Sequence, residues 1–181
     1  MLKTLKGLLT IAAKKDVRFH LNGIHVVCDD EGAVTLEASD GYCGMILENM
    51  SHMFNVAPGT DVILCRTSLD NALKMFGPKA APTLSVNDTG ARLNEYPITL
   101  IDGRYPDLKR AFRADSSAKC NEIGLDFEIL ATACKACALV SHEFQLKGGI
   151  FKVRDASEPI LIRRELSRGG TMLVGVMPMR I

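Results

Sequence analysis

The sequence lacks the features of a membrane-spanning or exported protein. No uninterrupted apolar stretch in its 181 residues reaches the roughly eighteen residues that a membrane span requires. The opening residues MLKTLKGLLTIAAKKD interrupt their apolar run with Lys3 and Lys6 and contain no small-residue cleavage site, unlike a secretion signal. We therefore expect a cytoplasmic protein whose six cysteines are free thiols in a reducing compartment.

Motifs for catalysis and metal binding are also missing. No glycine-rich phosphate loop follows a strand-like run, and no serine lies in a nucleophile elbow. The four histidines are scattered singly, without an HxxxH or HExxH spacing. The acidic turn 29–32 lacks the ligand spacing of an EF-hand. We expect no enzyme, no cofactor and no bound metal.

One motif favours chemistry at first sight, the CxxC formed by Cys134 and Cys137. A redox motif belongs at a strand-to-helix junction, and a structural zinc site needs a second pair of ligands. Neither condition is met, because the motif lies in the middle of an alanine-rich helical stretch. We interpret both cysteines as core residues and keep a thiol redox or zinc protein as the weakest alternative.

The sequence does contain one pattern of helix and strands that occurs three times. The chain is 47% hydrophobic and long enough to form one or two domains. Apolar residues recur at helical spacing over 2–13, and helices are also predicted over 69–76, with Ser68 as N-cap, and over 128–139. Short strand-like runs separate and follow these helices, and the order repeats about every sixty residues. The predicted fold class is α+β, with three helix-plus-antiparallel-sheet units. The predicted strands cover 17–21, 24–28, 33–38, 44–47, 62–65, 83–86, 91–93, 98–101, 122–127, 144–147, 150–154, 160–164 and 172–176.

A polar segment separates the second unit from the third. Residues 113–119 are small, polar and charged, a composition that suits an exposed connector. We predict a first domain of two units over 1–112, a connector over 113–121, and a half domain over 122–181.

The net charge of +1 does not by itself indicate a nucleic-acid-binding protein. Each of the three predicted helices nevertheless carries lysine on its outer face. These side chains could contact phosphates without reading bases, although a solvated surface is the simpler interpretation of each helix alone. The candidate DNA-binding residues are Lys3, Lys6, Lys14, Lys74 and Lys135.

Three separated stretches resemble, in order, the bacterial sliding clamp, the beta subunit of DNA polymerase III. They are DVRFHLNG at 16–23 with ASDG at 38–41, IDGRYPDLKR at 101–110, and VMPMRI at 176–181. Residues 1–112 look like the family's middle domain without its opening strand, and 122–181 look like the second half of its third domain. The resemblance implies a DNA-clamp fold, in which helices line a hole around duplex DNA and sheets lie outside.

Ring closure does not carry over directly, because the family's first domain has no counterpart in this sequence. Three units per chain would reach the family's total of twelve in a tetramer, which we state as a hypothesis about a homo-oligomer. A monomer or a small open oligomer is the competing state.

The resemblance also implies a pocket that captures short peptide motifs of polymerases and other clamp-binding proteins. An apolar cleft suits such a ligand, and methionine adapts its shape to several partners. Cys43, Gly44 and Gly175 are smaller than the family's usual residues, which predicts a wider or shallower pocket. The implied lining is Leu21, Ser39, Gly41, Tyr42, Pro106, Arg110, Ala111, Val176, Met177, Pro178, Met179, Arg180 and Ile181.

The expected function is that of a non-enzymatic DNA polymerase processivity factor that binds partner peptides, with encirclement of duplex DNA depending on ring closure. The alternative is an adaptor or decoy that keeps the pocket, forms no ring, and competes for clamp partners. Oligomeric state and retention on DNA separate the two.

Overall fold

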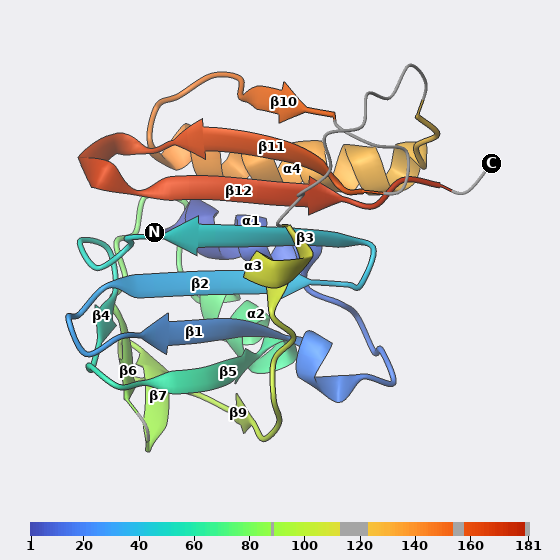
Figure 1. The fold of residues 1–181 in the computed structure, drawn as a ribbon. Helices are drawn as coiled ribbons and strands as arrows, with labels where there is room; N and C mark the ends of the chain where they lie inside the picture. Colours follow the sequence, from blue (N-terminus) through green and yellow to red (C-terminus); the bar gives the residue numbers. More distant parts are fainter. Residues whose placement is uncertain (88, 113–122, 154–157, 180–181) are drawn as a thin grey trace.

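The computed structural model describes residues 1–87, 89–112, 123–153 and 158–179. Helices α1 (Leu2–Ile11) and α4 (Phe127–Glu143) lie side by side behind a large sheet, and α2 (Arg66–Lys74) lies on the same side (Figure 1). The four-residue α3 (Leu108–Ala111) lies in front of the sheet. Two short 3-10 turns complete the helical elements, η1 (Phe19–Leu21) and η2 (Ser167–Gly169).

The large sheet is antiparallel throughout and has eight strands in the order β10-β11-β12-β3-β2-β1-β5-β9. Its strands are β1 (Gly23–Cys28), β2 (Val34–Ser39), β3 (Cys43–Glu48), β5 (Asp61–Cys65), β9 (Leu100–Ile101), β10 (Ile150–Lys152), β11 (Ile160–Glu165) and β12 (Thr171–Val176). A second sheet has the order β4-β6-β7-β8. It contains β4 (Asn55–Val56), β6 (Leu84–Asn87), β7 (Gly90–Leu93) and β8 (Tyr96–Ile98).

The predicted α+β pattern of repeated units is confirmed. Helices α1, α2 and α4 are each followed by three strands that pair in sequence order, β1-β2-β3, β6-β7-β8 and β10-β11-β12. The first and third units meet where β12 pairs with β3, from Thr171 opposite Glu48 to Val176 opposite Cys43. The large sheet therefore contains strands from both predicted domains. The predicted connector, 113–121, lies outside the described residues.

The pleat of β3 divides its side chains between two apolar cores. Met45 and Leu47 point into the main core, which the helices and both sheets enclose, whereas Ile46 belongs to a smaller core on the other face. Residues 105–112 cover that second face with Tyr105 and Phe112. Because both faces are covered, β3 reads as a nearly continuous buried run rather than as an alternating one.

Small residues let α1 and α4 approach closely. A Cβ added to Gly7 would lie 2.7 Å from Cγ2 of Val140 and 3.1 Å from the carbonyl oxygen of Ala136. At the next turn of the pair, the backbone N–H of Lys3 donates to Oε2 of Glu143 at 2.9 Å. Residue numbers fall along one helix as they rise along the other, so the two helices are antiparallel.

The end of α1 is held by a side chain from the start of α2. The last carbonyls of a helix have no partner within the helix. Nη1 of Arg66 donates to the carbonyl oxygens of Leu9 and Ala12, at 2.6 Å for Ala12. The arginine thus joins the first unit to the second.

Two predicted strands are wrong because local hydrogen bonds close turns there. Residues 17–18 form a bend that leads into η1 at Phe19–Leu21, and the Asn22 side chain accepts from the N–H of Asp16 and donates to its carbonyl oxygen, both at 2.8 Å. Residues 144–147 continue from α4 as a turn, in which Leu146 N–H donates to the Ser141 carbonyl oxygen at 2.8 Å. Both segments contain β-forming residues, and the turn bonds override that propensity.

Two helix starts also differ from the prediction. Ser68 is not an N-cap, because α2 already begins at Arg66 and the Ser68 hydroxyl accepts from the N–H of Thr99 at 3.1 Å. Among the described residues of the predicted strand 122–127, only Gly124 makes a β-bridge, to Met179. Asp126 there is the N-cap of α4 and accepts from the N–H of Glu128 at 2.7 Å.

None of the helices in the described ranges combines the length and apolar character that a membrane span needs.

We predict that Gly7→Leu lowers the free energy of unfolding by about 1–3 kcal/mol, because the new side chain has to displace Val140 or separate α1 from α4. Lys6→Leu is the matched control, since Lys6 is the preceding residue of the same helix and is exposed. Urea denaturation of both variants measures the difference. Equal stability of the two variants would contradict the close approach of the helices.

Candidate peptide-binding site

A cavity of about 250 Å³ opens on the front of the large sheet, where β3 and β12 lie beside the segment that leads into α3. It gathers residues from four separated parts of the chain. Of the sequence-predicted lining, the structure brings together Leu21, Ser39, Gly41, Tyr42, Pro106, Ala111 and Met177.

One wall of this pocket is the turn between β2 and β3. The carboxylate of Asp40 accepts from the N–H groups of Tyr42 at 2.8 Å and Cys43 at 2.7 Å. The Ser39 hydroxyl donates to the Cys43 carbonyl oxygen at 2.8 Å and accepts from Gly41 N–H at 3.0 Å. The side chain of Tyr42 is 62% exposed, so the fixed turn presents an aromatic ring at the rim.

A second wall carries the charge of the pocket. Arg18 lines it and forms a two-pronged contact with Asp16, from Nε to Oδ1 at 3.0 Å and from Nη2 to Oδ2 at 2.8 Å. Nη2 also donates to the Asp40 carbonyl oxygen at 3.2 Å. The hydrogen bonds from Arg18 lower the pKa of Asp16 to about 2, so this pair stays charged at neutral pH. The guanidinium therefore supplies a fixed polar edge to an otherwise apolar cavity.

The third wall is the segment 105–112, whose Phe112 ring lies over the small residues of the sheet. Asp107 caps α3 by accepting from Arg110 N–H at 2.9 Å, which holds Phe112 against the sheet. A Cβ on Gly175 would lie 2.2 Å from the Phe112 ring, and one on Gly44 would lie 2.8 Å from it. The small residues of the sheet do not widen the pocket, because the ring of Phe112 occupies the space above them.

The end of β12 contributes less of the lining than predicted. Met177 lines the pocket, is 40% exposed, and donates its N–H to the Tyr42 carbonyl oxygen at 2.9 Å. Val176 is fully buried in the main core, and Met179 is 49% exposed outside the lining, with its N–H on the Gly124 carbonyl oxygen. Neither Pro178 nor the exposed Arg110 is part of the lining. Arg180 and Ile181 lie outside the described residues.

Four lining residues were not predicted, namely Arg18, His20, Leu108 and Phe112. The sequence signal that could have indicated Leu108 and Phe112 is their spacing of four, which puts both on one face of a short helix after a capping aspartate. No comparable signal identifies Arg18 and His20, whose position depends on the turn that Asn22 closes.

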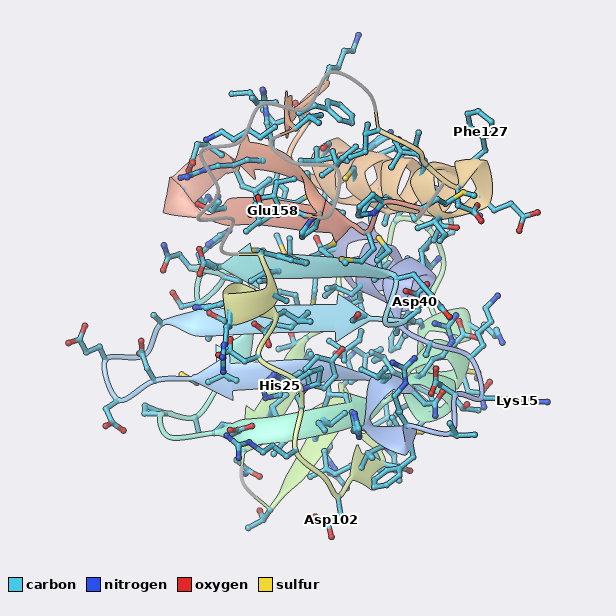
Figure 2. All side chains as sticks on the ribbon, turned by 45° about the vertical axis from the view of Figure 1, so that its right-hand side comes forward. Lys15, His25, Asp40, Asp102, Phe127 and Glu158 are labelled. Atoms are coloured by element: carbon cyan, nitrogen blue, oxygen red, sulfur yellow. The ribbon has the colours of Figure 1, made fainter. Side chains whose placement is uncertain are left out.

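A histidine on the sheet supports the third wall from below. The His25 ring, labelled in Figure 2, belongs to β1. It stacks on the Tyr105 ring, with centroids 4.8 Å apart, directly before Pro106 enters the pocket. Its Nδ1 faces Oε2 of Glu37 at 2.9 Å, and its Nε2 faces Oδ1 of Asp61 at 2.8 Å. Burial of the ring lowers the pKa of His25, but the hydrogen bonds to the two carboxylates outweigh burial and raise it above the ordinary 6.5. Because both ring nitrogens face acceptors, the imidazolium is the form that this arrangement favours.

Four of the predicted DNA-contacting lysines lie on helices α1, α2 and α4, and Lys14 follows the end of α1. Two of them have partners, since Lys3 Nζ lies 2.6 Å from Nδ1 of His142 and Lys74 forms an ion pair with Asp70 at 2.8 Å. The other three are exposed, and in the described part of the chain they make no ion pair. These three are Lys6, Lys14 and Lys135.

The structure does not give Cys134 and Cys137 of the CxxC the surroundings of a redox or zinc site. Burial raises the pKa of Cys137 to about 12, so this thiol is protonated at neutral pH, the opposite of an activated redox cysteine. Both cysteines lie inside α4 rather than at its N-terminus. The described residues also contain no group of three or more histidine, cysteine, aspartate or glutamate residues that could hold a metal ion.

Comparison with known proteins identifies relatives in sequence and in structure. No protein-family model matches the chain. The beta sliding clamp of Buchnera aphidicola subsp. Acyrthosiphon pisum (strain APS) is 28% identical over 151 residues, which cover 78% of this chain and 40% of that protein. The chain therefore spans less than half the length of the relative that it matches.

Solved structures of sliding clamps share the fold. The Helicobacter pylori beta clamp in complex with diflunisal superposes with a TM-score of 0.70 at 13% identity, covering 100% of this chain and 64% of that one. The DNA polymerase sliding clamp of Pseudomonas aeruginosa with a ligand has a TM-score of 0.68 at 15% identity, covering 99% and 64%. The resemblance to the sliding clamp family and the DNA-clamp fold are thus both confirmed.

We predict that His25 stabilises the folded protein most below about pH 6.5, and that this contribution is lost as the pH rises through the raised pKa of the folded state. His25→Gln should therefore reduce the free energy of unfolding more at about pH 6 than at about pH 9. Urea denaturation at both pH values, with the exposed His52→Gln as control, measures the difference. A deficit that does not depend on pH would contradict a charged His25.

Proposed function

We propose that this relative of the bacterial sliding clamps is a cytoplasmic, non-enzymatic DNA polymerase processivity factor. It would bind DNA polymerase and other clamp-binding proteins through short peptide motifs, contact duplex DNA without sequence specificity, and work as a homo-oligomer. The observation that carries this proposal is the front pocket, in which the stretches 16–23, 38–41 and 101–110 and the end of β12 converge.

The chemistry of the pocket suits a short hydrophobic peptide. Its walls are mostly apolar, while Arg18 and the backbone of the 39–43 turn offer a few fixed polar groups at the rim. Methionine and tyrosine side chains at the opening are exposed and can adjust to different ligands. A preformed cleft of this kind binds with little reorganisation, and we expect a Kd in the micromolar range, about −8 kcal/mol.

The opposite side of the sheet carries the proposed DNA contact. Helices α1 and α4 lie there side by side, and the unpaired Lys6 and Lys135 are exposed on them. Ammonium groups on helices attract phosphates without reading bases, as a protein that moves along duplex DNA requires. The peptide pocket and the DNA-contacting surface would then lie on opposite faces of one sheet.

A second candidate is an adaptor or decoy that keeps the pocket but forms no ring. Such a protein needs the pocket but no ring contact, and the described residues of a single chain supply all of the lining. Such a protein would compete with a complete clamp for the same peptides. It would bind peptide normally but would not remain on circular DNA.

For the pocket, we predict that a clamp-binding peptide binds with roughly micromolar affinity. Met177→Glu should weaken binding at least about tenfold, because it puts a carboxylate into the apolar lining. Met75→Glu is the matched control, since Met75 is 62% exposed on α2. Fluorescence anisotropy with a labelled peptide measures all three. Unchanged affinity in Met177→Glu would remove the pocket assignment.

For DNA, we predict that the double variant Lys6→Glu with Lys135→Glu weakens binding to a labelled duplex by roughly tenfold or more at low salt and flattens its salt dependence. Lys109→Glu is the control, because Lys109 lies on α3 in front of the sheet and pairs with Glu48 at 2.9 Å. Binding lost equally in both variants would place the DNA contact elsewhere.

A further inference from the structure

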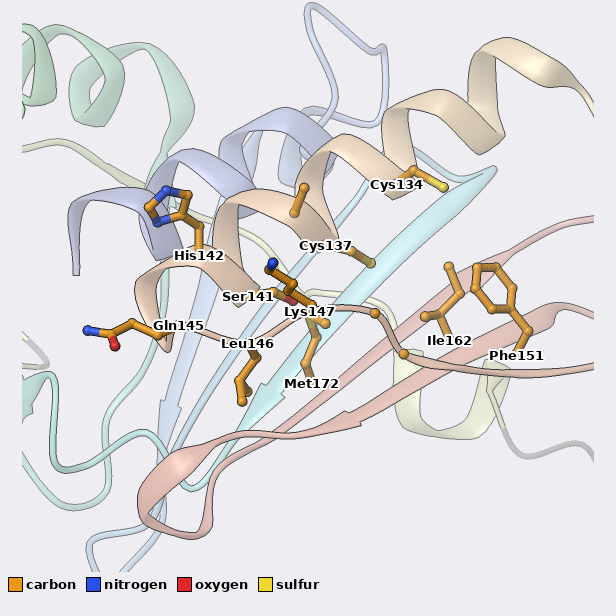
Figure 3. Close-up of a pocket in the computed structure, with 13 residues that line it drawn as sticks. Cys134, Cys137, Ser141, His142, Gln145, Leu146, Lys147, Phe151, Ile162 and Met172 are labelled. Atoms are coloured by element: carbon orange, nitrogen blue, oxygen red, sulfur yellow. The ribbon is translucent and has the colours of Figure 1, made fainter.

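A second apolar groove, of about 630 Å³, lies between α4 and the strands of the third unit (Figure 3). Its deepest lining residues are Ile162 and Met172, which are 3% and 1% exposed and belong to the main core. Cys134 and Cys137 line it on the helix, and Phe151 lines it on β10. The groove shares no lining residue with the peptide pocket, and its volume is in the range of small-molecule sites.

The turn after α4 closes one end of this groove. The N–H of Leu146 donates to the Ser141 carbonyl oxygen at 2.8 Å, which folds the chain back against the last turn of the helix. Gly149 then approaches β11 so closely that an added Cβ would lie 3.1 Å from Cγ2 of Ile162. Lys147 lies between these two fixed points and is part of the lining.

A buried hydroxyl at this end of the groove has no partner. Ser141 lines the groove and is only 6% exposed. Within the part of the chain that the structure describes, its hydroxyl neither donates nor accepts a hydrogen bond. Buried polar side chains are normally hydrogen-bonded, because burial without a partner is costly. The Ser141 hydroxyl therefore indicates a polar ligand group at this end.

The charge of the groove selects the sign of that group. The Lys147 side chain is exposed and makes no ion pair in the described ranges, in which no aspartate or glutamate lines the groove. The Cys137 thiol is uncharged at neutral pH, since burial raises its pKa to about 12. The remaining polar side chains of the lining, His142 and Gln145, are exposed. An anionic group is the complement of this lining, and one ammonium outweighs the partial negative charge at the end of α4.

We propose that the groove binds a fatty acid, whose carboxylate accepts hydrogen bonds from the Lys147 ammonium group and the Ser141 hydroxyl. Its apolar chain would lie over Ile162, between Cys137 and Phe151. An apolar channel with polar groups at one end matches a ligand with an apolar chain and a single charged head. This inference depends on neither peptide binding nor DNA binding.

The test is the binding of laurate to the full chain, measured by isothermal titration calorimetry below the concentration at which laurate forms micelles. We expect saturable binding that Ser141→Ala weakens about tenfold, as the loss of one hydrogen bond to a charged group does. Lys147→Glu should weaken it at least as much. Lys135→Glu is the matched control, because Lys135 is an exposed lysine of α4 outside the lining. Circular dichroism establishes that all three variants are folded.

A ligand of opposite charge tests the role of the carboxylate. Dodecyltrimethylammonium has the same apolar chain as laurate but a cationic head, and it should bind at least about tenfold more weakly. Equal binding of the two compounds would overturn the proposal, because the groove would then select an apolar chain alone.

A thiol-protection measurement locates the ligand. Cys134 is exposed in the groove, whereas Cys65 is half-buried at the end of β5. Laurate should slow the modification of Cys134 by a maleimide severalfold and leave that of Cys65 unchanged, as read by mass spectrometry of peptides. Laurate binding that leaves Cys134 unprotected, or that survives both Ser141→Ala and Lys147→Glu, overturns the proposal. Absence of saturable binding also overturns it, and an assembled chain in light scattering would then identify a second copy as the occupant of the groove.

Discussion

The antiparallel pairing of β3 with β12 joins the first and third units into one sheet, and both proposed functional surfaces take their positions from it. At one end of this pairing, Met177 hydrogen-bonds to Tyr42 and closes the peptide pocket. Behind it, the same junction brings α1 against α4 and sets the spacing of the exposed lysines. Six residue pairs form the junction, from Thr171 opposite Glu48 to Val176 opposite Cys43, and most of these residues are buried. A change that separated the two strands would therefore disturb the pocket and the helix layer together.

The repeating unit was predictable because each of its parts has a strong local signal. The helical spacing from Leu2 onward and the short β-rich runs after it survive in the structure with small shifts at their ends. Two of the failures occurred where a side chain rather than the backbone pattern decides the local structure. Asn22 closes the turn that replaces the expected strand over 17–21, and Thr99 takes the hydroxyl of Ser68, which was expected to cap α2. Such long-range or side-chain bonds leave no trace in hydrophobic periodicity.

The pocket was predictable only in part, for a related reason. The resemblance identified the stretches that converge, and seven of the residues that it implied do line the cavity. It could not indicate Arg18, whose place depends on its contact with Asp16 and the Asp40 carbonyl group. It also counted Val176 as a lining residue, whereas the pleat of β12 turns this side chain into the main core. Successive side chains of a strand point to opposite faces of the sheet, so two neighbouring residues such as Val176 and Met177 do not line the same cavity.

The aromatic ring above Gly44 and Gly175 has a consequence for chemical selectivity. The two glycines and Phe112 fit together as a matched set, since no side chain can be added to either glycine while the ring stays in place. A small molecule shaped to fill a deep cavity at this point would meet the ring, while a flat compound could stack on it. Inhibitors could thus distinguish this chain from a clamp with bulky strand residues by shape alone, although both would offer an apolar cleft to a peptide.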